Sequence, residues 1–392
     1  MRIVILGGRL QGTEAVYLCS KAGYETVLVD KDPNAPAKNL ANEFHMIDII
    51  KEVDAAERIL KTSDAVLPAC ENMQTLALLE NLCNKLGVPF MQDSAAYRIT
   101  SDKTKTTSFF LKTGIPTPEA WPACGFPVIV KPSTKSGSEG VYRADNTHQL
   151  EKALEAVRII DRKPVVQEFI EGPALSLEVI SARGSARPLQ VTALEFDERY
   201  GCKRVYAPAE TSRESEDRMS ELGTKIASEL RLNGLTDIQA LVKGSSPKVN
   251  EINARLPSQT PTVVYHSTGI NMAELLVRLF LEDRLDVAEI RPKSAVLYQH
   301  VKAFRNELKV QGEHVMANAL GLRLEENFFG AEEAITNLRH GTNATDGVAT
   351  LIVKSHDIRG AVKKMEEVVR RIMREFALER YNDPSPRSGR IV

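Results

Sequence analysis

Residues 1–90 alternate between strand and helix patterns, and this alternation constrains the fold more than any other feature of the chain. Strands are predicted at 2–6, 26–30, 44–48 and 65–69, and helices near 11–22, 51–61 and 72–86. A β-α alternation of this kind is typical of a small parallel sheet with helices on both faces. The chain is therefore expected to begin with a Rossmann-like α/β domain.

The first strand runs directly into the turn Gly7-Gly8-Arg9-Leu10-Gln11-Gly12. The dinucleotide fingerprint G-x-G-x-x-G needs glycine at its third position, where the backbone approaches a pyrophosphate, and Arg9 stands there instead. Arg9 therefore argues against an NAD-dependent dehydrogenase. The N–H groups at the start of the following helix suit one end of an amino-acid substrate, or the nucleotide across a domain interface, and Leu10 and Gln11 are the residues expected to make that contact.

Composition excludes several classes of function. The chain has 392 residues, enough for two or three domains, and its 43% hydrophobic and 26% charged residues are ordinary for a globular protein. The formal net charge of −1 gives no basic surplus for nucleic acid, and no apolar run reaches the roughly 20 residues that span a bilayer. The five cysteines are scattered, which favours free thiols in a reducing cytoplasm. Neither a nucleic-acid nor a membrane partner is expected, and the oligomeric state stays open.

The pattern changes at about residue 94. Residues 94–290 are predicted to form an α+β core with helices at 101–114, 147–158 and 214–231. One strand is predicted to end at Lys131 and another to cover 164–172. Two hairpins are predicted, one pairing 175–182 with 188–196 and one pairing 235–242 with 248–255. The segment EIRPK at 289–293 suggests a boundary before strands near 294–303 and 347–354 and an amphipathic helix near 357–376. The expected domains are 1–93, 94–290 with a smaller subdomain at about 116–170, and a small α+β segment over 291–392.

The second hairpin carries the first candidate site. In KVNEINAR, apolar and polar residues alternate, so Glu251, Asn253 and Arg255 share one face of a strand. A carboxylate beside an amide oxygen is a hard-oxygen site for Mg²⁺, and an arginine two residues later can bind a phosphate or a carboxylate. Asp237 and Gln239 share one face of the paired strand, and either could complete the metal shell. A solvated polar face is the alternative for this strand alone.

Two further features suit a nucleotide. Lys131 ends an apolar strand just before the loop STKSGSEG (133–140), and Lys103 lies on the preceding helix; cations beside a Ser- and Gly-rich loop suit polyphosphate, although this loop is not a Walker A motif. In VVQEFIEG, Phe169 and Ile170 offer apolar faces to an adenine. Taken singly, the loop is explained by a common surface loop with a lysine at its base, and VVQEFIEG is better explained by a strand that turns a corner at Glu171-Gly172.

Taken in order, Lys103, VIVKP, the glycine loop, QEFIEG, DIQ and NEINAR resemble the ATP-grasp superfamily in sequence order and spacing over roughly residues 1–290. The resemblance implies that ATP lies between two subdomains and is used with Mg²⁺, with two ions expected. The resemblance implies that Lys103 and Lys131 bind the phosphates, that Ser138 takes part in lid closure, and that Gln167 and the backbone of Glu168, Phe169 and Ile170 bind adenine. It also implies that Glu251 and Asn253 bind the metal together with Asp237 or Gln239. Lys131 and Arg255 are the implied catalytic residues, with Arg255 steadying the transferred phosphoryl group.

Two positions depart from the family pattern. A ribose-binding glutamate is expected two residues past the hinge glycine, where this chain has Ala174, so Glu171 or Glu178 is expected to replace it. Many members also have glutamate at the position of Gln239, and this difference favours Asp237 over Gln239 as the metal ligand.

Within the superfamily, the chain looks most similar to the carboxylate-amine ligases of pyrrolysine biosynthesis, which couple 3-methyl-D-ornithine to the ε-amine of L-lysine. The stretches GGRLQGTEAVYLCSKAGYETVLVDKDPNAPAK, VIVKPSTKSGSEGVYR and EINARLPSQTPTVVYHSTGINM prompt this comparison. It implies small-molecule amino-acid substrates, with lysine and 3-methylornithine as the pair. The expected substrate residues are Leu10, Glu71, Asn72, Glu139, Arg255, Ser258 and Gln259.

Three alternatives stay open. A purine-pathway carboxylase or a different amino-acid ligase of the same superfamily would use the same ATP motifs with another acceptor. A non-catalytic binding module is a third class, and the intact set of Glu251, Asn253 and Arg255 argues against it. No residue of the motifs is an obvious base for the attacking amine.

Overall fold

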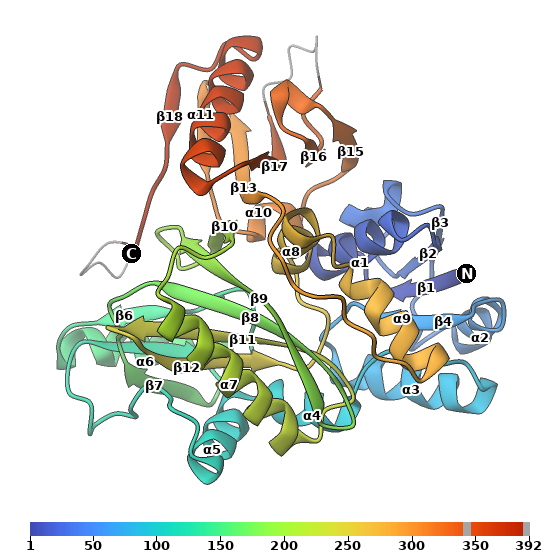
Figure 1. Cartoon of the computed structure of the whole chain (residues 1–392), viewed down its shortest axis with the longest axis horizontal. Helices are drawn as coiled ribbons and strands as arrows, with labels where there is room; N and C mark the ends of the chain where they lie inside the picture. Colours follow the sequence, from blue (N-terminus) through green and yellow to red (C-terminus); the bar gives the residue numbers. More distant parts are fainter. Residues whose placement is uncertain (340–345, 387–392) are drawn as a thin grey trace.

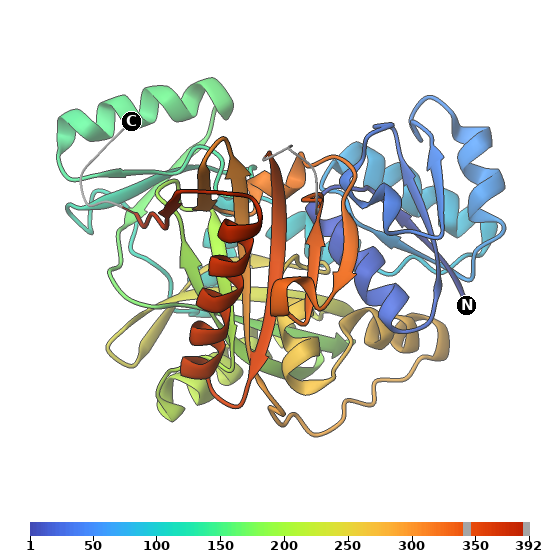
Figure 2. The same cartoon turned by 90° about the horizontal axis from the view of Figure 1, so that it is seen from above.

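The structure is a computed structural model, and it describes residues 1–339 and 346–386 (Figure 1). Three sheets organise it: a four-stranded sheet in the order β3-β2-β1-β4, a three-stranded sheet in the order β6-β5-β7, and an eleven-stranded sheet built from all later strands. In both views the N-terminal sheet and the three-stranded sheet lie on opposite sides of the molecule, with the large sheet between them (Figures 1 and 2).

The N-terminal sheet is parallel and covered on both faces, as the β-α alternation predicted. Its elements are β1 (Arg2–Leu6), α1 (Leu10–Lys21), β2 (Glu25–Asp30), η1 (Pro36–Asn39), β3 (Glu43–Met46), α2 (Val53–Leu60), β4 (Ala65–Pro68) and α3 (Met73–Leu86). Ile3 and Ile5 face a core shared with α1, whereas Val4 and Leu6 face a second core with residues of α2 and α3. A strand that is buried on both faces reads as a continuous apolar run, which explains the sequence pattern of β1.

The three-stranded sheet is antiparallel, with β5 between β6 and β7. The elements of this region are α4 (Ser94–Thr100), α5 (Lys103–Thr113), β5 (Val128–Pro132), β6 (Tyr142–Ala144), α6 (Thr147–Ile160) and β7 (Pro164–Glu168). Val128 and Val130 pack against Leu150, Ala153 and Val157 of α6, forming a small core of their own.

The eleven-stranded sheet runs β12-β11-β8-β9-β10-β13-β17-β16-β15, with β14 added to β13 and β18 to β14. Its strands and helices are β8 (Ala174–Ala182), β9 (Ser185–Phe196), β10 (Cys202–Ala207), α7 (Arg213–Leu230), β11 (Gly234–Lys243), β12 (Ser246–Asn253), α8 (Thr260–Thr268), α9 (Met272–Glu282), β13 (Ala295–Phe304), β14 (Glu307–Val310), α10 (His314–Ala317), β15 (Arg323–Glu326), η2 (Phe328–Gly330), β16 (Glu333–Thr336), β17 (Gly347–Ser355), α11 (Ile358–Glu375) and β18 (Arg380–Asn382). Antiparallel pairing of β10 with β13 carries the sheet past residue 290 without a break. The division of the chain at 93 and 290 stays a prediction.

Both predicted hairpins are confirmed, since β8 pairs with β9 and β11 pairs with β12. The sequence patterns did not indicate several elements, among them α4, β6, β10, α8 and α9, and also β14, α10, β15, β16 and β18 beyond residue 290. Helix α8 is buried on nearly all sides, so it has no polar stripe to reveal a helical period. Among the described residues, no helix is long and apolar enough to cross a bilayer.

Candidate active site

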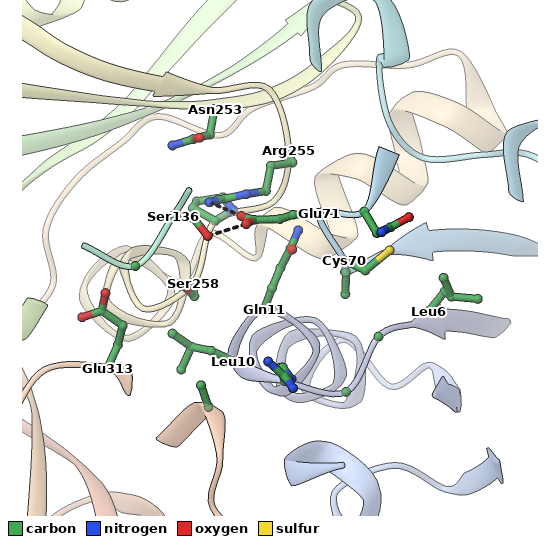
Figure 3. A pocket seen from close by; sticks show the side chains of 18 of the residues that line it. Leu6, Leu10, Gln11, Cys70, Glu71, Ser136, Asn253, Arg255, Ser258 and Glu313 are labelled. Carbon is green, nitrogen blue, oxygen red and sulfur yellow. Dashed lines mark hydrogen bonds and ion pairs between the residues drawn. The ribbon is translucent and has the colours of Figure 1, made fainter. Parts of the chain in front are cut away.

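A cavity of about 830 Å³ lies where the N-terminal sheet meets the large sheet (Figure 3). Its wall contains the turn after β1, the residues that follow β4, residues 136–139 of the glycine loop, the facing ends of β11 and β12, and the start of α10. Open parallel sheets place ligands at the carboxyl ends of their strands, and β1 and β4 both end here. The geometry therefore supports a small-molecule site at this junction.

The glycines of the β1–α1 turn serve its packing. Gly7 has φ +105°, and a Cβ placed on Gly12 would lie 2.0 Å from the carbonyl oxygen of Gly7. Asp30, which ends β2, accepts a hydrogen bond from the N–H of Gly8 at 2.6 Å, so it holds the turn itself. Both Leu10 and Gln11 line the cavity, and Gln11 Nε2 donates to the carbonyl of Leu256 at 3.0 Å.

The β11–β12 hairpin brings the predicted metal ligands together. In its register Asp237 faces Asn253 and Gln239 faces Glu251. Asp237 is only 1% exposed, and its Oδ2 accepts from Gln239 Nε2 at 3.2 Å and from Asn253 Nδ2 at 3.3 Å. Its Oδ1 is buried without a hydrogen-bond partner. Burial raises the pKa of Asp237, and the nearby charge of Arg255 opposes that rise.

Two lysines, one on α5 and one on β5, converge on the same hairpin. Lys103, the first residue of α5, places its Nζ 3.4 Å from Glu251 Oε1. Lys131 Nζ donates to Asn250 Oδ1 at 2.9 Å. Burial lowers the pKa of Lys131 to about 8, against the opposing attraction of Glu251. Burial acts to raise the pKa of Glu251, but Lys103, Lys131 and Arg255 outweigh it, and the net pKa is lowered.

Arg255 lies at the centre of a cluster that joins three parts of the chain. Its guanidinium contacts Glu71 Oε1 at 3.2 Å and Asp237 Oδ1 at 3.5 Å. The other oxygen of Glu71 accepts a hydrogen bond from Ser136 Oγ of the glycine loop. As Figure 3 shows, Arg255, Glu71 and Ser136 point toward one another across the cavity. Glu71 therefore connects the N-terminal sheet, the hairpin and the loop.

The predicted adenine residues lie apart from the cavity wall, at the contact between β7 and the hairpin. Gln167 Nε2 donates to Asn250 Oδ1 at 2.7 Å, and the Glu168 carboxylate accepts from Lys248. The Phe169 ring faces the Arg143 guanidinium with 4.2 Å to the ring centroid, and Ile170 is buried.

The two candidates for a ribose contact differ in exposure. Glu171 is exposed, whereas Glu178 is fully buried beside Ser176, and burial raises its pKa to about 8. A fully buried carboxyl group presents no surface to a sugar. This placement favours Glu171 over Glu178.

The remaining predicted substrate residues, Asn72, Glu139, Ser258 and Gln259, all line the cavity. Asn72 caps α3 by accepting from the N–H of Thr75, and Glu139 lies 3.6 Å from Lys135. Gln259 has φ +75° and donates to the Cys202 carbonyl at 3.2 Å, so its side chain is already engaged. Ser138 has φ +58°, and its Oγ donates to the Tyr200 carbonyl at 2.6 Å, which ties the glycine loop to the segment before β10.

Comparisons with known proteins agree with this geometry. Residues 100–259 match an ATP-grasp domain model, and residues 3–91 match the N-terminal domain of PylC-like proteins. The 3-methyl-D-ornithine–L-lysine ligase of Methanosarcina barkeri is 36% identical over 316 residues, which are 80% of this chain and 84% of that ligase. The chain belongs to the PylC-like ATP-grasp family.

Solved structures show the same fold at lower identity. The biotin carboxylase domain of Hydrogenobacter thermophilus 2-oxoglutarate carboxylase, crystallised with MgADP, matches with a TM-score of 0.74 at 18% identity, covering 94% of this chain and 89% of that one. An L-amino acid ligase from Bacillus licheniformis matches with a TM-score of 0.69 at 18% identity, covering 94% and 97%. The ATP-grasp match, together with the MgADP in the first of these structures, supports the use of ATP and Mg²⁺ in general.

The donor set of this PylC-like protein fits magnesium held together with phosphates. In residues 1–339 and 346–386, no three His, Cys, Asp or Glu side chains gather as a metal-binding group. Asp237, Glu251 and Asn253 instead offer two carboxylates and an amide, and Asp237 Oδ1 lacks a hydrogen-bond partner. Mg²⁺ keeps several oxygen ligands from water and substrate phosphates, so this incomplete shell suits it.

Two residues of the site were missed from the sequence. Asn250 is the extra residue of a β-bulge, because Gln239 pairs with Glu251 while Ala240 pairs with Val249. A bulge changes the side to which a residue points, which lets Asn250 contact both Lys131 and Gln167 although strict alternation would place it on the far face. Glu313, in a segment without a motif, also lines the cavity; no signal in the sequence indicated it.

Proposed function

We propose that this chain is an ATP-dependent ligase that couples the carboxylate of 3-methyl-D-ornithine to the ε-amine of L-lysine, as in pyrrolysine biosynthesis, releasing ADP and phosphate. The observation that carries the proposal is the convergence of Lys103, Lys131 and Arg255 on Asp237 and Glu251 beside a cavity of about 830 Å³. The substrates are those named for relatives that are 36% identical over most of this chain.

When bound, ATP supplies the phosphoryl group that activates a carboxylate toward an amine, and two Mg²⁺ ions offset its charge. Asp237, Glu251 and Asn253 are the residues that would hold the metal, with Gln239 holding the Asp237 carboxylate in place. Lys103 and Lys131 supply fixed positive charge for the phosphates, in a site where burial makes each charge act more strongly.

Arg255 orients the reacting carboxylate, since its guanidinium is already held by Glu71 and Asp237. A preorganised cation loses little conformational freedom when the substrate arrives. Residues 133–140 act as a lid that keeps water from the activated carboxylate, and the bond between Ser136 and Glu71 is one latch of that lid. Gln167 and the backbone from Glu168 to Ile170 receive the adenine.

The test is ADP release with a matched product assay. Purified protein is incubated with Mg-ATP, D-ornithine or its 3-methyl form, and L-lysine, and the dipeptide-like amide is identified by mass spectrometry. Release of ADP that requires both amino acids, with the isopeptide as product, supports the proposal. If no ADP forms above the level seen without amino acids, or if it forms only with a purine-pathway acceptor, the proposal is wrong.

A further inference from the structure

Glu313 is a carboxylate of the cavity that has no role in the proposed ligase reaction. It directly precedes α10, and its N–H donates to the Cys202 carbonyl at 3.0 Å, which fixes it against the start of β10. The carboxylate Oε2 is buried and has no hydrogen-bond partner. A Cβ placed on Gly137 would lie 3.7 Å from Oε1, so the lid loop comes close to this side chain.

No cation balances Glu313 within the part of the chain that the structure describes. Three other glutamates of the cavity have cationic partners: Glu71 contacts Arg255, Glu251 contacts Lys103, and Glu139 faces Lys135. Asp30 and Asp32 accept backbone N–H groups of their own loops. Burial raises the pKa of Glu313 to about 7, and the negative charges of Asp197 and Glu251 add to this rise. A buried carboxylate without a partner is costly, and a cationic ligand would remove that cost.

Part of the cavity wall is apolar, and it comes close to Glu313 through Phe196, which pairs with Cys202, the residue whose carbonyl accepts the Glu313 N–H. Leu10, Leu194, Phe196 and Ala317 line the same cavity. In the view of Figure 3, Leu10 and Ser258 lie between Glu313 and Glu71. An apolar wall that ends in one unpaired carboxylate matches a chain of methylene groups that ends in an ammonium group.

We propose that Glu313 binds the side-chain ammonium group of a diamino-acid substrate, whose methylene groups lie along Leu10, Leu194 and Phe196. This assignment rests on the proposed function, because it places an amino-acid substrate in this cavity. It also gives the C-terminal segment a role, since Glu313 lies beyond residue 290 and completes the site from that side.

The test measures binding without turnover. Dissociation constants for D-ornithine, L-lysine, D-norvaline and L-norleucine are measured by calorimetry with saturating ADP, in the wild type, in Glu313→Gln and in Glu221→Gln, an exposed control on α7. We expect Glu313→Gln to weaken the binding of one diamino acid by about 10- to 100-fold, the usual effect of losing a charge-assisted hydrogen bond. The dissociation constants of D-norvaline and L-norleucine, which lack the side-chain amine, should each be the same in all three proteins. The diamino acid whose binding is weakened identifies the substrate that Glu313 holds.

A second measurement separates binding from a structural role. An ammonium ion at Glu313 favours the carboxylate form, so wild-type protein should release protons on binding near pH 7, and calorimetry in buffers of different ionisation enthalpy counts them. Glu313→Gln should lose that release. The titratable groups that interact with Glu313 keep their identity in the variant and serve as the internal background: Asp197, Cys202, Glu251 and Tyr298.

Two outcomes overturn the assignment: Glu313→Gln binds both diamino acids within twofold of wild type, or proton release is identical in the two proteins. The same assay with 2,4-diaminobutyrate and 2,3-diaminopropionate distinguishes this proposal from the proposed function. If the wild type binds only one of these shorter diamino acids, with loss in Glu313→Gln, Glu313 keeps its role and the proposed substrates are wrong. If the wild type binds no diamino acid, both proposals fail.

Discussion

The affinity of the site for nucleotide phosphates should fall as pH rises above neutrality, because of Lys131. Burial lowers the pKa of this lysine to about 8, and its Nζ donates a hydrogen bond to Asn250 Oδ1. The sign is fixed by the direction of this shift. Lys131 carries its charge below pH 8 and loses it as pH rises through that value, so phosphate binding that depends on the charge is strong at pH 7 and lost above pH 8.

The magnitude follows from the fraction of charged lysine. With a pKa of about 8, Lys131 is charged in about nine of ten molecules at pH 7 and in about one of thirty at pH 9.5, so ADP affinity should fall by about 7- to 25-fold over this range if the charge contributes about 10- to 150-fold to binding. Lys131→Met removes the charge at every pH. At pH 7 it should bind ADP about 10- to 150-fold more weakly than wild type, which is the range of about 1.5–3 kcal/mol for a hydrogen bond to a charged group.

The assay is calorimetric titration of ADP in EDTA, which removes divalent metal from the comparison, at half-unit steps between pH 7 and 9.5. The wild-type and Lys131→Met curves should be far apart at pH 7 and approach each other by pH 9.5. A wild-type affinity that stays constant across the range, or a Lys131→Met curve that falls in parallel with the wild type, would refute the reasoning.

Three further predictions concern the metal, the lid and the turn. Glu251→Gln should lower the rate of ADP release by at least about 100-fold in a coupled assay while the melting temperature stays within a few degrees, since it removes one metal carboxylate and keeps the shape; retained turnover would exclude Glu251 as a ligand. Glu71→Ala should free Arg255 and speed amide hydrogen exchange in residues 133–140, measured by mass spectrometry, whereas unchanged exchange would show that the latch does not hold the lid. Gly12→Ala should destabilise the protein by about 2–4 kcal/mol in urea unfolding, because its Cβ would overlap a main-chain carbonyl at 2.0 Å; a loss below about 0.5 kcal/mol would contradict the packing role.

Much of the fold could be predicted from the sequence because the deciding interactions are local. The alternation of strand and helix patterns over residues 1–90 predicted a parallel sheet, and the two hairpins were predicted from alternating polar and apolar residues and their turn residues. Helices α8 and α9 were not predicted. A helix such as α8, buried on nearly all sides, leaves no periodic pattern in the sequence.

The candidate site, like the fold, could be predicted from the sequence only in part. The sequence by itself determined that Glu251 and Asn253 share a strand face, because a strand repeats every two residues. Arg255 was predicted on the same face, but β12 ends at Asn253, so Arg255 lies in the bend that follows the strand. The sequence also determined that the first turn lacks the glycine of a dinucleotide site, since Arg9 occupies that position.

Tertiary structure alone decided the rest, because those contacts join residues that are far apart in the chain. Glu71 reaches Arg255 across 184 positions, and a β-bulge turns Asn250 toward Lys131. Glu313 reaches the cavity because it follows β14, which pairs with β13, and because its N–H bonds to the carbonyl of Cys202 at the start of β10. The turn after β1 likewise became one wall of this cavity, with its glycines required by packing and Asp30 bound to its own loop.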